Sequence, residues 1–245
     1  MENFYETDKG KIFYKVEGEG EPILMVHGFA DNSNYMEFLS SELNGYKRIL
    51  VDLPCHGKSD DFSFSLDDIV KYFDNIVEKL SLNSYYILGH SLGSIISEYV
   101  LINSQKAKKG IFISPSTRID DKIIEIISSW ISDEEESLKY AYDEEFLEKN
   151  YEFIKKFEDE NQYDFSRFSN IAEVFINLNI EGLKSNKECL AIVAKNDKIF
   201  GKEYYENIKN IFNNCKMDII NGGHSLILEK PKELSQIIKQ FLNGK

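Results

Sequence analysis

The sequence contains few cysteines and prolines and lacks a long apolar run. Its three cysteines, at positions 55, 189 and 215, form no Cys-x-x-Cys pair, so neither a zinc site nor a disulfide framework is predicted. Four prolines and 14 glycines exclude a collagen-like or linker-dominated chain. The first 20 residues are charged and lack the apolar core of a signal peptide. The most apolar window, 123–131, contains Glu125 and is too short to span a bilayer. We therefore expect a cytoplasmic protein with reduced thiols and no membrane insertion.

Positive charge is also scarce. The chain has 29 Lys and Arg against 42 Asp and Glu, which gives a formal net charge of −13 and a pI near 4.9. Repulsion from phosphates argues against a nucleic-acid partner and against an anionic membrane surface. The 42% of hydrophobic and 29% of charged residues are typical of a soluble globular protein. A length of 245 residues allows one sizeable core.

Short apolar runs alternate with helical patterns along most of the chain. Strands are predicted at 11–16, 22–26, 48–53, 85–88, 110–114, 189–194 and 217–220. Helices are predicted at 66–80, where Ser65 is the expected N-cap, at 92–102, and at 231–242, which begins with a proline. Strands that alternate with helices predict an α/β fold whose mostly parallel sheet is covered on both faces.

Residues 116–183 interrupt this alternation, because only helical patterns are found there, at 122–131, 134–142, 144–157 and 170–178. The segment holds 18 Asp and Glu against 7 Lys and Arg, so most of the net negative charge lies in it. We expect a helical cap at 116–183 inserted into a β/α core formed by 1–115 and 184–245. Its aromatic residues are expected mainly to pack between helices, with some above the substrate pocket; they are Trp130, Tyr140, Tyr142, Phe146, Tyr151, Phe153 and Phe157.

The motif Gly89-His90-Ser91-Leu92-Gly93 lies between a predicted strand and a predicted helix. A serine on such a tight turn needs small neighbours, which the two glycines supply, and the turn presents its hydroxyl above the sheet. Ser91 is therefore the candidate nucleophile. The competing interpretation, a serine that only forms a turn, does not explain the motifs that follow it in order.

A serine nucleophile needs a histidine base and a carboxylate that orients it. His224 is the one histidine after Ser91, and Asp197 follows the predicted strand 189–194 and precedes His224 by 27 residues. The alternative for Asp197 is a helix cap. Asp52 is a rival carboxylate that we expect to be structural. His27 and His56 are likewise expected to be structural, and no role is predicted for His90.

The oxyanion of a tetrahedral intermediate needs two N–H donors. Leu92, directly after the nucleophile, supplies one at a helix N-terminus. The second is expected from the loop after the strand 22–26, where Gly28 permits a turn and the backbone N–H of Phe29 is the candidate.

The chain resembles the α/β-hydrolase superfamily, in its lid-bearing serine hydrolase subgroup, over residues 10–242. The motifs that carry the resemblance are His27-Gly28-Phe29, 52–59 (Asp-Leu-Pro-Cys-His-Gly-Lys-Ser), 89–93, Asn196-Asp197 and Gly223-His224. The resemblance implies an eight-stranded, mostly parallel sheet with helices on both faces and a helical cap. It also implies that Ser91 is the nucleophile, His224 the base and Asp197 the orienting acid, with Phe29 and Leu92 as oxyanion donors.

Cys55 departs from the family pattern, since many relatives have glycine there, and we expect its thiol at the edge of the pocket. The resemblance calls for no cofactor and no metal. A serine nucleophile excludes the aspartate-dependent epoxide hydrolases and haloalkane dehalogenases of the superfamily.

The expected reaction is hydrolysis of a carboxylic ester of a small to medium substrate through an acyl-enzyme on Ser91. The acidic cap should repel polyanions, so a neutral or cationic, partly apolar small-molecule ester is predicted. Three alternatives remain open: another acyl hydrolase (lipase, thioesterase or peptidase), a carbon–carbon bond hydrolase, and a ligand-binding signalling regulator. The sequence leaves the natural substrate, the mobility of the lid and the oligomeric state open.

Overall fold

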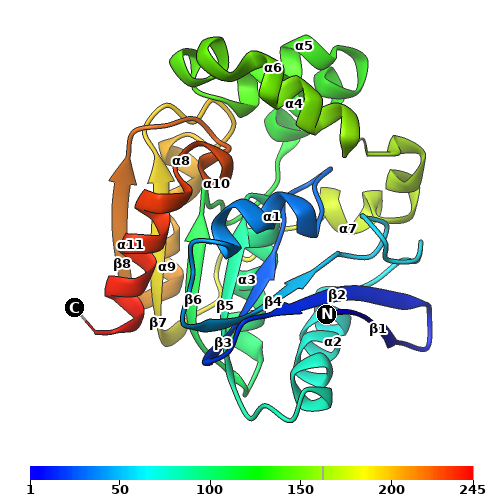
Figure 1. Ribbon diagram of the computed structural model, residues 1–245, viewed down its shortest axis with the longest axis vertical. Coiled ribbons are helices and arrows are strands. Elements are labelled where there is room, and N and C mark those ends of the chain that lie inside the picture. The colour runs from blue at the N-terminus through cyan, green and yellow to red at the C-terminus, as the bar shows by residue number, and fades with distance from the viewer. Residues whose placement is uncertain (162, 245) are drawn as a thin grey trace.

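The computed structural model describes residues 1–161 and 163–244, without the side chains of residues 130–132 and 134. The described residues form one eight-stranded sheet in the order β1-β2-β4-β3-β5-β6-β7-β8 (Figure 1). Its strands are β1 (Glu2–Glu6), β2 (Lys11–Glu17), β3 (Glu21–Val26), β4 (Tyr46–Val51), β5 (Tyr85–His90), β6 (Ala107–Ile113), β7 (Ser185–Ala194) and β8 (Phe212–Ile220). β2 runs antiparallel to β1 and β4, and the other neighbours are parallel. The predicted mostly parallel sheet is confirmed.

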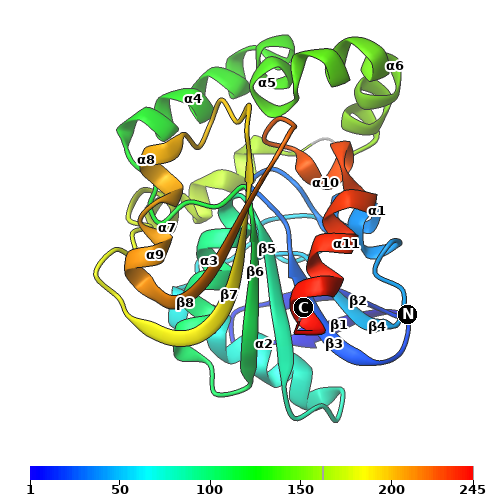
Figure 2. The same cartoon turned by 90° about the vertical axis from the view of Figure 1, so that its left-hand side faces the viewer.

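Helices cover both faces of the sheet, as the alternation of patterns predicts. They are α1 (Ser33–Ser40), α2 (Leu66–Lys79), α3 (Leu92–Asn103), α4 (Asp121–Ser132), α5 (Glu134–Ala141), α6 (Glu144–Glu160), the 3-10 helix η1 (Phe165–Asn170), α7 (Ala172–Ile176), α8 (Lys202–Tyr205), α9 (Ile208–Ile211), α10 (Leu226–Glu229) and α11 (Pro231–Leu242). Helices α2, α3, α8 and α9 share one buried cluster, and α1, α10 and α11 share the other (Figure 2). The sheet therefore separates two apolar cores.

Local signals account for the bounds of several helices. Ser65 is the N-cap of α2, as predicted. Its side chain accepts a hydrogen bond from the Asp68 N–H, and the Asp68 side chain accepts from the Ser65 N–H, which completes a capping box. Pro231 begins α11, where its missing N–H is not needed. Each of these helices turns its apolar stripe to the sheet.

Several elements have no counterpart among the predicted ones, namely β1, α1 and the four-residue helices α8, α9 and α10. Strand β1 lies at the edge of the sheet, and its alternately exposed residues include two glutamates, so its sequence resembles a loop. Helix α1 has only 8 residues, too few for a clear helical period. Strand β8 begins at Phe212, five positions before the predicted start, because its first residues are mostly polar and exposed.

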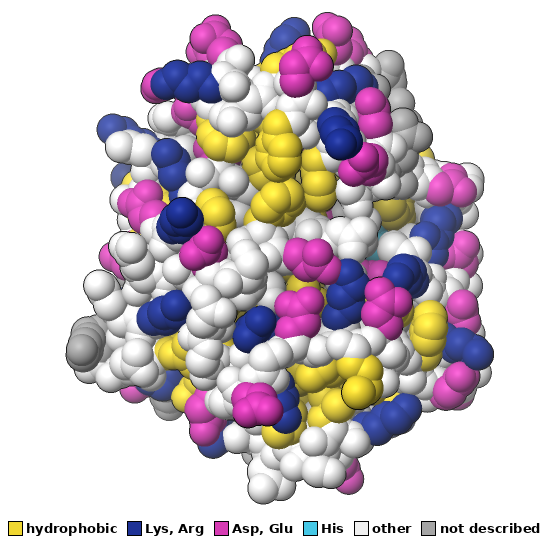
Figure 3. Space-filling view, in the orientation of Figure 1, with side chains coloured by type: hydrophobic (Ala, Val, Ile, Leu, Met, Phe, Trp, Pro, Cys, Tyr) yellow, Lys and Arg dark blue, Asp and Glu magenta, His cyan; other side chains and the backbone are white. Residues whose placement is uncertain are grey.

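Residues 116–183, here called the helical segment, contain α4, α5, α6, η1 and α7 and lie above the carboxyl edge of the parallel strands (Figure 1). Apolar residues of the segment, Ile123 and Phe175 among them, join the buried cluster that α2, α3, α8 and α9 share. Figure 3 shows acidic and basic side chains interspersed over its outer surface. The division of the chain into a core and a cap stays a prediction. In the described part of the chain, no helix has the length and apolarity needed to cross a membrane.

Candidate active site

The predicted site residues meet at the carboxyl edge of the sheet. Phe29 follows β3, Ser91 follows β5, Asp197 follows β7 and His224 follows β8. Because carboxyl ends of parallel strands lie along one edge, residues that are far apart in sequence come together there. The structure brings Ser91, Asp197 and His224 into contact and places Phe29 and Leu92 beside them.

Ser91 occupies a strained turn between β5 and α3, with φ 54° and ψ −120°. An ideal Cβ at Gly89 would lie 2.0 Å from the Gly93 carbonyl oxygen, and one at Gly93 would lie 2.3 Å from the His27 carbonyl oxygen. Any side chain at either position would push the strand and the helix apart. The backbone geometry of this turn therefore requires glycine on both sides of Ser91, as the motif predicts.

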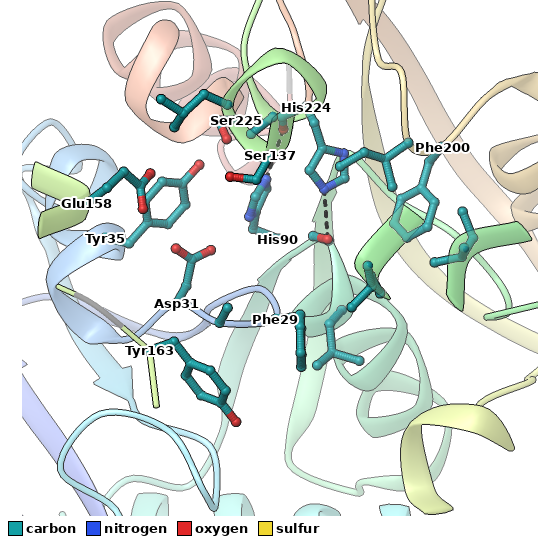
Figure 4. Close-up of a pocket in the computed structure, with 18 of the residues that line it drawn as sticks. Phe29, Asp31, Tyr35, His90, Ser137, Glu158, Tyr163, Phe200, His224 and Ser225 are labelled. Atoms are coloured by element: carbon teal, nitrogen blue, oxygen red, sulfur yellow. Dashed lines mark hydrogen bonds between the residues drawn. The ribbon is translucent and has the colours of Figure 1, made fainter. Parts of the chain in front are cut away.

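A chain of hydrogen bonds runs from Ser91 to Asp197. His224 Nε2 lies 2.8 Å from Ser91 Oγ, the contact dashed in Figure 4. His224 Nδ1 lies 2.8 Å from Asp197 Oδ2. The side chains of His224 and Asp197 are 5% and 3% exposed. A carboxylate only accepts, so Nδ1 carries the proton, and Nε2 is free to accept the serine proton. Asp197 Oδ1 accepts from the N–H groups of Ile199 and Phe200, which fixes its carboxylate.

The backbone of His224 is held by two further side chains. Its carbonyl oxygen accepts from Ser114 Oγ at 2.7 Å and from His90 Nε2 at 3.0 Å. Burial lowers the pKa of His90 to about 3, so its ring is neutral. His90 is thus a positioning residue that sequence reasoning missed, and its place next to the nucleophile was the only available signal.

Glu229 connects the His224 loop to the helical segment. Its Oε1 accepts from the N–H of Asp143 at 3.0 Å and from the N–H of Gly223 at 3.1 Å, and its Oε2 lies 3.0 Å from the same Gly223 nitrogen. Burial raises the pKa of Glu229, and the two backbone N–H groups offset part of this shift. Nothing in the sequence pattern indicated this residue.

The two predicted oxyanion donors have unused N–H groups. Among the described residues, no hydrogen bond uses the N–H of Phe29 or of Leu92. Leu92 is the first residue of α3, where backbone N–H groups lack helical partners and the helix dipole favours negative charge. The Phe29 ring packs on Phe168 and Phe175 of the helical segment, with centroids 5.2 and 4.9 Å away.

Other polar residues of the motifs lie in buried loop networks. Asp52 accepts from the N–H groups of Ser33 and Lys58 and does not line the cavity above Ser91. His27 Nε2 accepts from the Leu53 N–H, and burial lowers its pKa to about 4. Burial, followed by His27, lowers the pKa of His56 to about 3. These placements agree with structural roles.

The expectation for Cys55 is wrong. Its side chain is fully buried in the core, does not line the cavity, and donates to the Phe62 carbonyl oxygen at 3.6 Å. Its φ of 65° is in the left-handed region that favours glycine, which explains the glycine of many relatives. The thiol therefore contacts the backbone at Phe62 and does not reach the cavity.

A cavity of about 480 Å³ lies between Ser91 and the helical segment. One side is apolar and the other is polar. The apolar side is lined by Leu92, Ile119, Ile123, Ile127, Leu138, Phe175, Ile199 and Phe200, and the polar side by Asp31, Tyr35, Ser137, Tyr142, Glu158, Asn161 and Ser225. Of the aromatic residues predicted to contact the pocket, Tyr142 does so among the described side chains, and the side chain of Trp130 lies outside them. Tyr163, Phe165 and Phe175 take the place of the others.

Metal-ligating groups are not clustered in the part of the chain that the structure describes, since no three His, Cys, Asp or Glu side chains there could hold an ion. The arrangement can instead remove a proton from Ser91 and stabilise an oxyanion beside it.

Comparisons with known proteins agree with this architecture. A family model described as alpha/beta hydrolase fold matches residues 21–135. A probable lysophospholipase of Haemophilus influenzae is 23% identical over 260 residues, which cover 90% of this chain and 83% of the relative. An esterase from Exiguobacterium antarcticum superposes with a TM-score of 0.80 at 20% identity, over 99% of this chain and 100% of that one. A thermophilic esterase from Thermogutta terrifontis gives a TM-score of 0.86 at 17% identity, over 100% and 98%.

Proposed function

We propose that this chain, which has the alpha/beta hydrolase fold, is a serine hydrolase of the α/β-hydrolase superfamily that cleaves a carboxylic ester of a small to medium, partly apolar substrate. The observation that carries the proposal is the hydrogen-bonded series Ser91–His224–Asp197, with both contacts at 2.8 Å, at the floor of a cavity. Serine, a neutral histidine and two free N–H groups form the minimal set for acyl transfer to water.

The proposed mechanism has two steps. Ser91 Oγ attacks the ester carbonyl carbon while His224 Nε2 takes its proton, and Asp197 stabilises the resulting imidazolium. The N–H groups of Phe29 and Leu92 donate to the oxyanion. The intermediate collapses to an acyl-enzyme, and the alcohol leaves with the proton from Nε2. Water then attacks the acyl carbon with His224 again as base, which releases the acid and restores Ser91.

The cavity supports a substrate of limited size. A volume of about 480 Å³ lies in the range of small-molecule sites. Its apolar side, next to Leu92 and Phe200, suits a hydrocarbon part of the ester. The relatives include an esterase and a probable lysophospholipase, whose substrates are esters. We further propose that the protein acts in the cytoplasm on a small molecule, without a metal or an organic cofactor.

The test is steady-state hydrolysis of p-nitrophenyl esters from acetate to laurate. Wild type should turn over repeatedly, with a chain-length optimum set by the cavity, and Ser91→Ala should lower kcat by about 10⁴–10⁶-fold. Ser63→Ala, at an exposed serine, is the matched control and should keep wild-type rates.

Failure has a distinct signature. A wild type that a fluorophosphonate labels at Ser91 but that hydrolyses none of these esters would overturn the esterase assignment. The regulator and carbon–carbon hydrolase alternatives would then be tested, the first by saturable binding without turnover and the second by cleavage of a vinylogous diketone.

A further inference from the structure

The polar side of the cavity carries acidic groups that the proposed mechanism does not use. Asp31 comes from the loop before α1, and Glu158 comes from α6 in the helical segment. In Figure 4 both carboxylates face the cavity on the side away from the Ser91–His224 contact. Of all the acidic side chains described in the helical segment, Glu158 is the one that lines this cavity.

The carboxyl group of Asp31 has no partner within the described residues. The residue is partly buried, and its backbone N–H donates to the Gly28 carbonyl oxygen, but its side chain makes no hydrogen bond or ion pair there. An ideal Cβ at Gly28 would lie 3.0 Å from Asp31 Oδ2, 3.2 Å from His90 Nδ1 and 3.3 Å from Ser91 Cβ. The carboxylate, the imidazole and the nucleophile therefore converge on one point of the backbone. A single small substrate can reach both Asp31 and Ser91.

His90 adds a second unused acceptor at this point. Its ring is 2% exposed, and its Nδ1 has no hydrogen-bond partner. Its Nε2 must carry the proton, because it contacts the carbonyl oxygen of His224 at 3.0 Å. In a neutral imidazole the other nitrogen then has a free lone pair, so Nδ1 can only accept. The buried Nδ1 of His90 and the partly buried carboxyl group of Asp31 have no donor among the described residues, and a bound ligand can supply one.

Tyrosine hydroxyls extend the polar side. Tyr142 donates to Glu158 Oε1 at 2.8 Å, which fixes that carboxylate. Tyr35 is 2% exposed, and the Ser225 side chain lies beside its hydroxyl. Figure 4 shows this hydroxyl pointing into the cavity between Glu158 and Ser137. This hydroxyl can donate or accept, so it adds a further polar group to this side of the cavity.

Positive charge is missing from the walls. Among the described residues that line the cavity there is no lysine and no arginine. We propose that this acidic subsite, formed by Asp31, His90 Nδ1, Tyr35 and Glu158, binds an ammonium group of the ester substrate that carries at least one N–H. The inference rests on the proposed function, and it narrows the neutral or cationic substrate predicted from charge to a cationic amine ester.

The electrostatics of the empty subsite agree with this assignment. Burial and then the nearby Glu158 raise the pKa of Asp31 well above its usual range. A bound cation would remove this penalty by pairing with the ionised carboxylate. An additional anion, such as a phosphate or a free carboxylate, would increase it. The subsite therefore selects for positive charge and against negative charge.

The test compares esters that differ only in that charge. With the cation on the alcohol side, 2-(dimethylamino)ethyl acetate is compared with 3-methylbutyl acetate, in which C–H replaces N–H⁺. With the cation on the acyl side, methyl 4-(dimethylamino)butanoate is compared with methyl 5-methylhexanoate. A charge-assisted hydrogen bond should raise kcat/KM for the cationic member of at least one pair by about 10- to 100-fold.

Variants locate the effect. Asp31→Asn and Glu158→Gln should each reduce the cationic-to-neutral ratio of kcat/KM by about tenfold. The ratio compares two substrates on the same protein, so a general loss of activity does not change it. Glu152→Gln makes the same chemical change at an exposed position of α6 and should leave the ratio unchanged.

The outcomes separate this inference from the proposed function. Ser91-dependent hydrolysis with ratios of one or below for both pairs would overturn the subsite and keep the esterase. If no ester is hydrolysed, binding of the same four compounds to Ser91→Ala is measured by calorimetry. Tighter binding of the amines that is lost in Ser91→Ala/Asp31→Asn would support the subsite by itself, and equal binding would overturn it.

Discussion

Glu229 offers a prediction that joins stability to catalysis. Its carboxylate is 7% exposed and accepts the N–H groups of Gly223 and Asp143, of which the first precedes His224 directly. Glu229→Ala removes both acceptors. Glu229→Gln can keep both, because Oε1 alone lies 3.0 Å from one nitrogen and 3.1 Å from the other. The two variants therefore separate the acceptor from the charge.

The expected magnitude follows from the two N–H groups. Each buried donor left without a partner costs about 1–3 kcal/mol, and escape from the burial of a charge offsets part of this. We expect Glu229→Ala to lower the free energy of unfolding by about 2–4 kcal/mol, and the melting temperature by about 5–15 °C for a chain of this size. The kcat should fall by about tenfold or more, since a small displacement of His224 misaligns the base. The KM should change little, because Glu229 does not line the cavity.

The pH dependence of Glu229→Gln has a definite sign. A carboxyl whose pKa is raised on folding contributes stability at low pH and loses it as the pH rises through its folded pKa. The stability of the Gln variant relative to wild type should therefore increase from pH 4 to pH 8. Thermal melts measure the change in stability, and p-nitrophenyl ester kinetics measure the change in kcat. The control is Glu233→Ala, at an exposed position of α11. Equal melting temperatures for Glu229→Ala and wild type would refute the reasoning.

Three further predictions test the site. Asp197→Asn should lower kcat by about 10⁴-fold with little change in melting temperature, since the orientation of His224 Nδ1–H is lost; ester kinetics that match wild type would contradict this. Asp31→Asn should gain stability relative to wild type as the pH rises, because burial and Glu158 raise the pKa of Asp31, and melts at several pH values measure this. Gly93→Ala should lower the melting temperature by about 5 °C or more, because its Cβ would lie 2.3 Å from a backbone oxygen.

Much of the architecture could be predicted from the sequence because buried strands and helices have a recognisable pattern of apolar residues. The central parallel strands are buried on both faces and appear as apolar runs, and α2 and α11 show apolar stripes with start signals. Strand β1 was missed because an exposed edge strand needs no apolar run. The motif residues Ser91, Asp197 and His224 were predicted because each follows a strand that the apolar pattern indicates.

The sequence alone determined the central strands and the longer helices, the tight turn at Ser91 and the identity of the three hydrogen-bonded residues, since apolar runs, glycine spacing and strand ends are local properties. Only the tertiary structure decided what surrounds them. Asp31 and Glu158 are 127 positions apart, and Glu229 contacts Asp143 of the helical segment, 86 positions before it. Such contacts depend on how the helical segment packs on the sheet, and no local pattern encodes that packing. The three hydrogen-bonded residues could therefore be predicted from the sequence, whereas the residues that surround them in the cavity could not.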